Sequence, residues 1–449
     1  MRVLSQLNMN PDRSSRSLLH RLQSADRDAL VAVLTRGIQG GVMAAGAAAV
    51  IWRMSPSDQG FYFAFISFGI LLQLCDFGLS YATLQSARHL LATGRGHAIA
   101  PLGATALRIN VVATLLAWVI VGVLGWSVFA RTAVHANTDW VAPWIAFISG
   151  VAFNHFTAPS IFLVEGGVSV STAWRFRMRQ EIAAGLMLIL VLALGFGLWA
   201  LVAYYWTRFV LAALWMTSGI MPRKEARSLA FSITDWRRDV WPFQWRVGIS
   251  AISGYLVFQA FSPIFFALQG PAEAGRFALS LAVMNALVMV TTAWPVSQAA
   301  HFGGMLGRNE KLALSSRLVR LLLSSTAFSV AGAVVAVAAL LGLERFDPNV
   351  AARFADFGTT GLLIATAVIH HVVACFNVVL RSERRDPLLV LSVAGSVVTI
   401  ACMTIVAALS NARGVALVYF FTSAMGLPIA YAIYRKFARR HGFSAHASA

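Results

Sequence analysis

The sequence alternates between long apolar stretches and short polar gaps along almost its whole length. A hydrocarbon core about 30 Å thick requires about 20 apolar residues of helix per crossing, and twelve stretches are about that long. They lie at roughly 30–52, 59–81, 104–126, 140–164, 182–198, 199–220, 243–267, 273–297, 318–343, 357–381, 387–410 and 413–435. The pattern therefore predicts an all-α polytopic membrane protein with twelve transmembrane helices.

The basic residues collect in every second gap between these stretches. Most of the 36 Lys and Arg residues lie in the N-terminal segment, in the even-numbered gaps and after the last helix, whereas the odd-numbered gaps hold few. Because short loops rich in Lys and Arg stay cytoplasmic, both termini are predicted to be cytoplasmic. The first 29 residues contain no apolar core of a signal peptide, so we expect no cleaved leader.

Composition narrows the function further. A hydrophobic fraction of 58% and a mean hydropathy of +0.70 argue against a soluble protein. The net charge of +18 is explained by loops that lie beside anionic lipid headgroups, so nucleic acid is not an expected partner. Cys75, Cys375 and Cys402 all fall in predicted helices, which predicts neither a disulfide framework nor a metal cluster.

The two halves of the chain share a short motif. A shift of 215 residues aligns residues 56–60 (PSDQG) with 271–275 (PAEAG), and each Pro-x-acid-x-Gly motif begins an apolar helix. Gly94-Arg95 and Gly307-Arg308 follow in the next loops. Each block of six helices begins and ends on the same side, so the blocks are predicted to be related by a pseudo-twofold along the membrane normal. The alternative is a chance match in a twelve-helix protein without duplication.

This duplication gives a division into two lobes. The predicted parts are a cytoplasmic segment at 1–29, an N-lobe with helices 1–6 at 30–220, a cytoplasmic linker at 221–242, a C-lobe with helices 7–12 at 243–435 and a cytoplasmic tail at 436–449.

Three segments resemble a known family. Residues 54–62 (MSPSDQGFY), 76–80 (DFGLS) and 241–246 (WPFQWR) are similar to the polysaccharide-export branch of the multidrug/oligosaccharidyl-lipid/polysaccharide (MOP) superfamily, the bacterial O-antigen and exopolysaccharide flippases. The family pattern runs approximately Leu-x-Pro-x-x-x-Gly-x-Tyr into helix 2, followed by Asp-x-Gly near its inner end. Met54 replaces the usual Leu.

The resemblance implies a MATE-like, V-shaped pair of lobes around a central cavity. It further implies that the protein carries an undecaprenyl-pyrophosphate-linked oligosaccharide repeat unit from the cytoplasmic to the periplasmic leaflet of the bacterial inner membrane by alternating access. The product would serve O-antigen (lipopolysaccharide) or exopolysaccharide biosynthesis. We expect no cofactor, a proton or sodium gradient as the driving force, and membrane lipids, a polysaccharide polymerase and glycosyltransferases as partners.

Charged residues inside predicted helices are candidate site residues. Such charges cost about 2.5–3.5 kcal/mol on insertion scales and therefore mark cavities or paired sites. Arg36, Arg208 and Arg246 are candidates for a cationic cavity that binds pyrophosphate, because a guanidinium stays charged and fits phosphate oxygens with a planar fork. Asp76 is a candidate proton or cation site. The alternatives are an ion pair between Asp76 and an arginine, or arginines that snorkel to the interface.

His155 and His371 are candidates for coupling transport to a proton gradient, because imidazole titrates near neutral pH. The alternative is a buried neutral histidine that is hydrogen-bonded to a neighbouring helix. Adjacent residues on a helix point about 100° apart, so His370 and His371 cannot both face one cavity.

Two other functions compete with the flippase. A cation-coupled multidrug antiporter on the same fold needs cavity carboxylates, and Asp76 is the only carboxylate in the interior of the predicted helices. A polymerase or ligase of polysaccharide assembly needs a catalytic exterior loop, but the exterior gaps of about 5–15 residues leave little room for an acid/base pair. No nucleotide or metal motif is present, so the sequence does not favour an enzyme.

Overall fold

All regular elements of the described residues are helices. The computed structural model describes residues 34–35, 37–132, 138–218, 233–298, 302, 305, 311–380 and 387–440. After a helix that ends at residue 53, the elements are α2 (Pro56–Gln73), η2 (Leu74–Asp76), α3 (Leu79–Ala92), η3 (Gly96–Ala98), α4 (Ile99–Thr132), α5 (Val141–Phe156), α6 (Ala158–Gly167), α7 (Val170–Ala193), α8 (Trp199–Thr217), α9 (Ile233–Asp239), α10 (Trp241–Phe258), α11 (Phe261–Gln269), α12 (Pro271–Ser297), α14 (Lys311–Phe346), α15 (Pro348–Ala351), α16 (Phe357–Leu380), α17 (Leu389–Leu409) and α18 (Ala412–Arg440).

Within these described residues, nine helical segments are long and apolar enough to cross a membrane. They are Pro56–Asp76, Gly96–Thr132, Val141–Gly167, Trp241–Gln269, Pro271–Ser297, Ser316–Phe346, Phe357–Leu380, Leu389–Leu409 and Ala412–Arg440. The predicted spans at 30–52, 182–198 and 199–220 are not among these nine. The first lies partly outside the described residues, and the described residues of the other two lie mostly in α7 and α8. The structure supports a multi-pass membrane protein, and the count of twelve spans stays a prediction.

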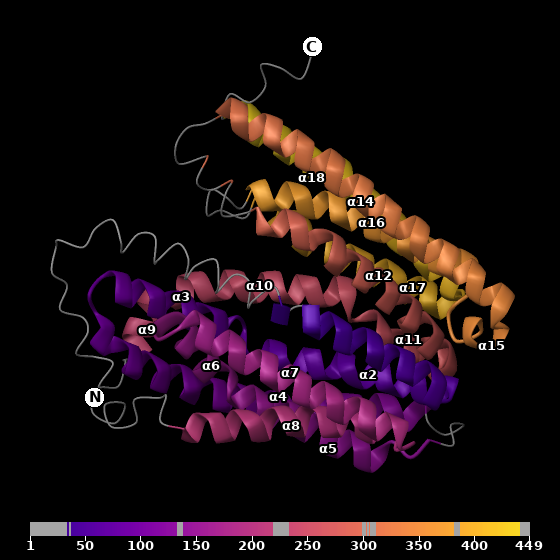
Figure 1. Cartoon of the computed structure of the whole chain (residues 1–449), viewed down its shortest axis with the longest axis horizontal. Helices are drawn as coiled ribbons and strands as arrows, with labels where there is room; N and C mark the ends of the chain where they lie inside the picture. Colours follow the sequence, from indigo (N-terminus) through magenta and orange to yellow (C-terminus); the bar gives the residue numbers. More distant parts are fainter. Residues whose placement is uncertain are drawn as a thin grey trace.

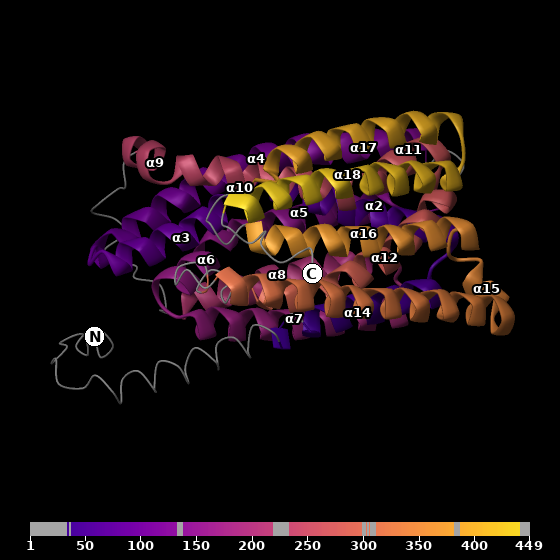
Figure 2. The same ribbon diagram turned by 90° about the horizontal axis from the view of Figure 1, so that it is seen from above.

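The helices form two blocks that meet at one end and diverge toward the other (Figure 1). One block contains α2 to α8, and the other contains α12 and α14 to α18. Both views place α11 and α15 at the end where the blocks join and α3 and α9 at the opposite end (Figures 1 and 2). We call these the outer and the inner end, because the predicted exterior and cytoplasmic gaps lie there.

The two copies of the Pro-x-acid-x-Gly motif pack against each other at the outer end. A Cβ atom on Gly60 of α2 would overlap the carbonyl oxygen of Pro271, and one on Gly275 of α12 would lie 2.5 Å from the carbonyl oxygen of Pro56. Each glycine therefore lets one helix approach the other at the same point of the motif. Reciprocal contact between corresponding residues is what a pseudo-twofold relation predicts.

Aromatic side chains fill the space next to this crossing. The ring of Phe266 in α11 lies 4.8 Å from Phe61 of α2 and 5.3 Å from Phe129 of α4, and all three side chains are fully buried. Edge-to-face ring pairs of this kind add to the stabilisation from apolar burial. The three rings join α11, which directly precedes α12 in the chain, to the first block.

Two polar side chains also connect the blocks at the outer end. Gln59 of α2 is buried, and its Nε2 donates to the carbonyls of Gly275 (2.8 Å) and Arg353 (3.1 Å). Arg353 in turn donates to the carbonyls of Ile51 (3.1 Å) and Met54. We call the contacts of Gln59, Gly60, Phe61, Phe129, Phe266, Gly275 and Arg353 the outer junction.

Candidate functional site

The predicted second span does not continue to residue 81. Phe77 (φ 48°) and Gly78 (φ 80°) adopt left-handed conformations that end the helix after η2. The Asp76 carboxylate accepts hydrogen bonds from the backbone N–H groups of Gly78 (2.9 Å) and Ser80 (3.1 Å). Asp76 thus satisfies backbone donors at the start of α3, as N-terminal capping residues do.

This break in helix 2 packs against the start of α10. The side chain of Gln244 donates to the Asp76 carbonyl (3.3 Å) and accepts from the Trp236 indole (3.0 Å). The rings of Phe77 and Trp241 stack with centroids 6.2 Å apart. Two of the segments that carry the family resemblance are therefore in contact, although 165 residues separate Asp76 from Trp241 in the sequence.

Replacing Gly78 with alanine should test this contact. The added Cβ would lie 2.9 Å from the Val247 side chain and 3.0 Å from the Gln244 carbonyl, in a left-handed backbone conformation. We expect a loss of about 1–3 kcal/mol of stability from overpacking, beyond about 1 kcal/mol from backbone strain. Gly94 (φ 73°) has no atom within 4 Å of the position that a Cβ would take, so Gly94→Ala is the control for strain alone. Equal melting temperatures of the two purified variants would contradict the contact.

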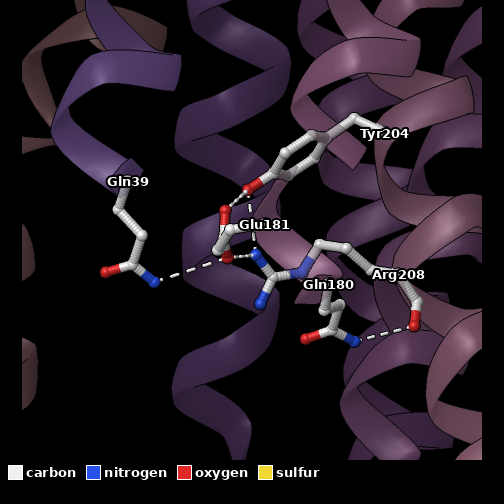
Figure 3. Close-up of polar contacts among 5 residues, drawn as sticks. All are labelled: Gln39, Gln180, Glu181, Tyr204 and Arg208. Atoms are coloured by element: carbon white, nitrogen blue, oxygen red, sulfur yellow. Dashed lines mark hydrogen bonds and ion pairs between the residues drawn. The ribbon is translucent and has the colours of Figure 1, made fainter. Parts of the chain in front are cut away.

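Arg208 lies near the middle of α8 and is paired with an acidic residue of α7. Its Nη1 atom forms an ion pair with Glu181 and donates to the Tyr204 hydroxyl (2.9 Å). Tyr204 donates to the second carboxylate oxygen of Glu181 (2.8 Å), and Gln39 donates to the first (3.4 Å), as Figure 3 shows. The Glu181 side chain is 3% exposed and that of Arg208 is 22% exposed. The charge of Arg208 is therefore balanced within the first block.

Glu181 was not among the residues predicted from the sequence. The alternative interpretation paired an arginine with Asp76, and the predicted fifth span began at 182, one residue after Glu181. In the structure α7 begins at Val170 and carries Glu181 near its middle. Buried residues at 173, 176, 180, 184, 188 and 192 recur every three or four positions. This spacing predicts a helix that begins at residue 170, and such a helix includes Glu181.

A second buried ion pair lies toward the inner end of the same block. Glu165 of α6 accepts from Arg177 of α7 at 2.6 Å, and the two side chains are 8% and 16% exposed. The Arg177 guanidinium also lies 4.6 Å from the ring centroid of Phe162 and 5.1 Å from that of Trp174. Glu165 and Glu181 thus both have an arginine partner, so neither offers a free carboxylate to a cationic ligand.

The two other candidate arginines are not part of the Arg208 ion pair in the described structure. Arg36 lies outside the described residues. Arg246 lies in the second turn of α10, is exposed, and has its guanidinium carbon 5.5 Å from the ring centroid of Trp245. The structure does not bring Arg246 together with Arg208, which is held by Glu181 within the first block.

His155 is buried in the last turn of α5. Its Nε2 atom has no hydrogen-bond partner within the described part of the chain, and its carbonyl accepts from Asn110 (2.9 Å). His155 and Asp76 therefore both lie in the first block, whereas His371 lies in the second.

His371 lies in the other block and faces away from its neighbour His370. The Nε2 atom of His371 is 3.2 Å from the Ser325 hydroxyl of α14 and 3.5 Å from the Cys375 sulfur. The Nε2 atom of His370 is 3.1 Å from the Tyr419 hydroxyl of α18. The two imidazoles point to different helices, as the helical spacing predicts, and each has the hydrogen-bonded environment of the alternative interpretation.

Two cavities lie at the inner end, and arginine lines each of them. One of about 580 Å³ lies between α12 and α14 and is lined by Trp294, Gln298, Phe302, Ser316, Arg317, Arg320, Leu321 and Ser324. The other, of about 520 Å³, lies beside α9 and α10 and is lined by Ile109, Trp236, Arg237, Trp241 and Gln244. Among the described residues that line them, neither cavity has a carboxylate. The sequence assigned no binding role to these arginines. It counted Arg237, Arg317 and Arg320 only among the basic residues that predict the orientation in the membrane.

Carboxylates near other cavities are accompanied by arginine. A cavity of about 420 Å³ at the outer end contains Glu273 and Asp356 together with Arg276 and Arg413. On α9, the hydrogen bond from Arg238 (2.9 Å) holds the pKa of the Asp239 carboxyl below its usual value. The inner-end cavities are thus positive, and the outer-end cavity is mixed.

Comparison with known proteins identifies the fold. No protein-family model and no curated protein matches the chain. Among solved structures, the inward-facing conformation of a multidrug resistance MATE family transporter of the MOP superfamily superimposes with a TM-score of 0.67 at 12% identity, covering 92% of this chain and 99% of that one. This chain has the fold of a MATE transporter. The predicted all-helical, MATE-like fold is thereby confirmed, whereas the predicted bounds of the two lobes, the linker and the terminal segments stay a prediction.

Other MATE-fold structures overlap less well. The outward-facing conformation of a multidrug resistance MATE family transporter gives a TM-score of 0.53 at 13% identity, covering 93% of this chain and 96% of that one. A MOP superfamily transporter from Pyrococcus furiosus, described as having a binding pocket of reverse polarity that suggests a different function, gives 0.52 at 13% identity, covering 93% and 95%. At such identities the similarity concerns the fold alone.

Proposed function

We propose that this protein is a flippase that moves an undecaprenyl-pyrophosphate-linked oligosaccharide from the cytoplasmic to the periplasmic leaflet, for O-antigen or exopolysaccharide biosynthesis. The MATE fold supports a membrane transporter. The distribution of basic residues predicts that both termini lie in the cytoplasm, and the resemblance to bacterial flippases implies the bacterial inner membrane. A polysaccharide polymerase and glycosyltransferases would act on the same lipid-linked substrate.

The observation that carries this proposal is the sign of the charge at the inner end. The cavities there are lined by Arg317 and Arg320 in one case and by Arg237 in the other, and the described part of each lining contains no carboxylate. Arginine forms planar, bidentate hydrogen bonds with phosphate oxygens. A substrate that carries a diphosphate fits such surfaces, whereas an organic cation is repelled by them.

A cation-coupled multidrug antiporter is the alternative, because several MATE-fold neighbours are described as multidrug transporters. Such an antiporter would need an acidic cavity, and the buried Glu165 and Glu181 are both neutralised by arginine. The reverse pocket polarity described for the Pyrococcus furiosus protein indicates that the fold accommodates both signs of charge. The polarity of this chain therefore favours an anionic substrate.

The arrangement of the blocks supports transport by alternating access. The outer junction closes one end, and the overlap is larger with an inward-facing MATE structure (TM-score 0.67) than with an outward-facing one (0.53). The substrate would then be received from the cytoplasmic leaflet. A proton or sodium gradient would drive the cycle, and we propose that protons couple through Asp76 and the buried His155, whose Nε2 atom has no hydrogen-bond partner among the described residues.

Reconstitution into liposomes tests the function. We expect the purified protein to move a fluorescent undecaprenyl-pyrophosphate-linked oligosaccharide between leaflets, measured by the fraction that an external quencher bleaches. Ethidium, a cationic drug, should accumulate no faster than in protein-free liposomes under the same gradient. The converse result, ethidium transport without lipid movement, would reject the flippase in favour of the antiporter.

A further inference from the structure

We propose that the cavity between α12 and α14 is the site at which the protein first captures the diphosphate group of its lipid-linked substrate. This inference rests on the proposed function and adds a site to it. Arg317 and Arg320 lie three residues apart on α14, so their side chains lie on one face of the helix about 5–6 Å apart at Cβ. Both line the same cavity, which would present two guanidiniums to one ligand.

Neighbouring polar groups complete the site. Gln298 at the end of α12 accepts a hydrogen bond from Arg317 (3.2 Å), which helps to position that guanidinium at the cavity. The hydroxyls of Ser316 and Ser324 line the same space, and the buried Phe302 and Leu321 form its apolar wall. The cavity of about 580 Å³ is within the range of about 300–1,000 Å³ that small-molecule sites occupy.

The site lies at the depth of lipid headgroups. The apolar span of α14 begins at Ser316, so Arg317 and Arg320 occupy its first turns. Trp294, 44% exposed near the end of α12, lines the same cavity, and tryptophan is typical of membrane interfaces. Farther along α14 toward the membrane, Leu323 is 69% exposed. A phosphate in the cavity could therefore remain attached to a chain in the hydrocarbon.

Charge favours a diphosphate over an ordinary phospholipid. The phosphodiester of a phospholipid carries one negative charge, whereas a diphosphate carries at least two and has more oxygens to accept from two guanidiniums. Each hydrogen bond to a charged group contributes about 1.5–3 kcal/mol, so a ligand that engages both arginines gains about tenfold or more in affinity. Of the lining residues that the structure describes, none is a carboxylate that would oppose this charge.

The test measures binding of undecaprenyl diphosphate to the full-length protein by native mass spectrometry. We expect R317Q/R320Q to bind about tenfold or more weakly than the wild type, because both guanidiniums are lost. R345Q is the matched control, since Arg345 is exposed at the opposite end of the same helix, and it should bind like the wild type. R317K/R320K should lie between, because lysine keeps the charge without the bidentate fork. Unchanged thermal unfolding of each variant verifies folding.

The remaining ligands separate the sources of phosphate. Phosphatidylglycerol and inorganic pyrophosphate should each bind more weakly than undecaprenyl diphosphate. Equal binding of phosphatidylglycerol would assign the cavity to ordinary lipid and overturn the proposal, as would wild-type affinity in R317Q/R320Q. If the wild type itself failed to bind undecaprenyl diphosphate, both the proposed function and the site would be rejected. If the wild type bound it and R317Q/R320Q bound it equally well, the site alone would be rejected.

Discussion

Replacement of Arg208 with glutamine is expected to lower the free energy of unfolding by about 3–5 kcal/mol, because it leaves the Glu181 carboxylate buried without its partner. Glu181 is 3% exposed, so water cannot replace the guanidinium. Glu181→Gln should lower the free energy of unfolding by a similar amount, because it leaves Arg208 without its anionic partner. Thermal unfolding of the purified variants, followed by tryptophan fluorescence, measures both losses.

The double variant E181Q/R208Q decides how the pair acts. It removes both charges together, so it should recover most of the stability that either single variant loses. If R208Q unfolded like the wild type and yet failed to transport lipid, Arg208 would act on the substrate directly, as the sequence alone suggested. Arg345→Gln makes the same charge change at an exposed position and should leave unfolding unchanged.

Gly60→Ala is expected to open the outer junction. The new methyl group has no room against the Pro271 backbone, so α2 and α12 must separate at their crossing. Overpacking of a close contact costs about 1–3 kcal/mol, which would shift a two-state equilibrium between closed and open outer ends by about fivefold or more. Spin labels on Arg131 of α4 and Phe346 of α14, both exposed at the outer end, would report this separation as a longer distance in pulsed electron paramagnetic resonance.

The control for this experiment is Gly361→Ala in α16. No atom lies within 4 Å of the Cβ that this substitution adds, so the distance distribution should match that of the wild type. The labelled proteins would carry alanine in place of Cys75, Cys375 and Cys402, so that only the introduced cysteines react. A Gly60→Ala protein that kept the wild-type distance would contradict the role of the glycine crossing.

Hydrophobic length made the fold predictable from the sequence. A crossing helix needs a fixed number of apolar residues, and nine of the predicted spans recur as long apolar helices within the described residues. The Pro-x-acid-x-Gly repeat could likewise be recognised in the sequence, because proline and glycine impose local backbone geometry. The structure adds that Gly60 and Gly275 meet each other.

The site was less predictable because it depends on contacts between distant helices. A hydropathy window averages over neighbours, so the fifth span was predicted to begin at residue 182, after Glu181, and the partner of Arg208 was missed. The role of Asp76 at the start of α3 depends on the left-handed conformation of Phe77, which composition does not reveal. From the sequence, Arg317 was only a basic residue of a loop. It lines a cavity because α12 and α14 pack together there.

The reciprocal packing of Gly60 and Gly275 bears on how such a chain could arise. In an isologous homodimer, one residue meets its own copy across the symmetry axis, so a single glycine serves both partners. The crossing of α2 and α12 has this form within one polypeptide. A separate six-helix ancestor could therefore have dimerised through the same surface before its gene was duplicated and fused, and either half could afterwards change at this point only in step with the other.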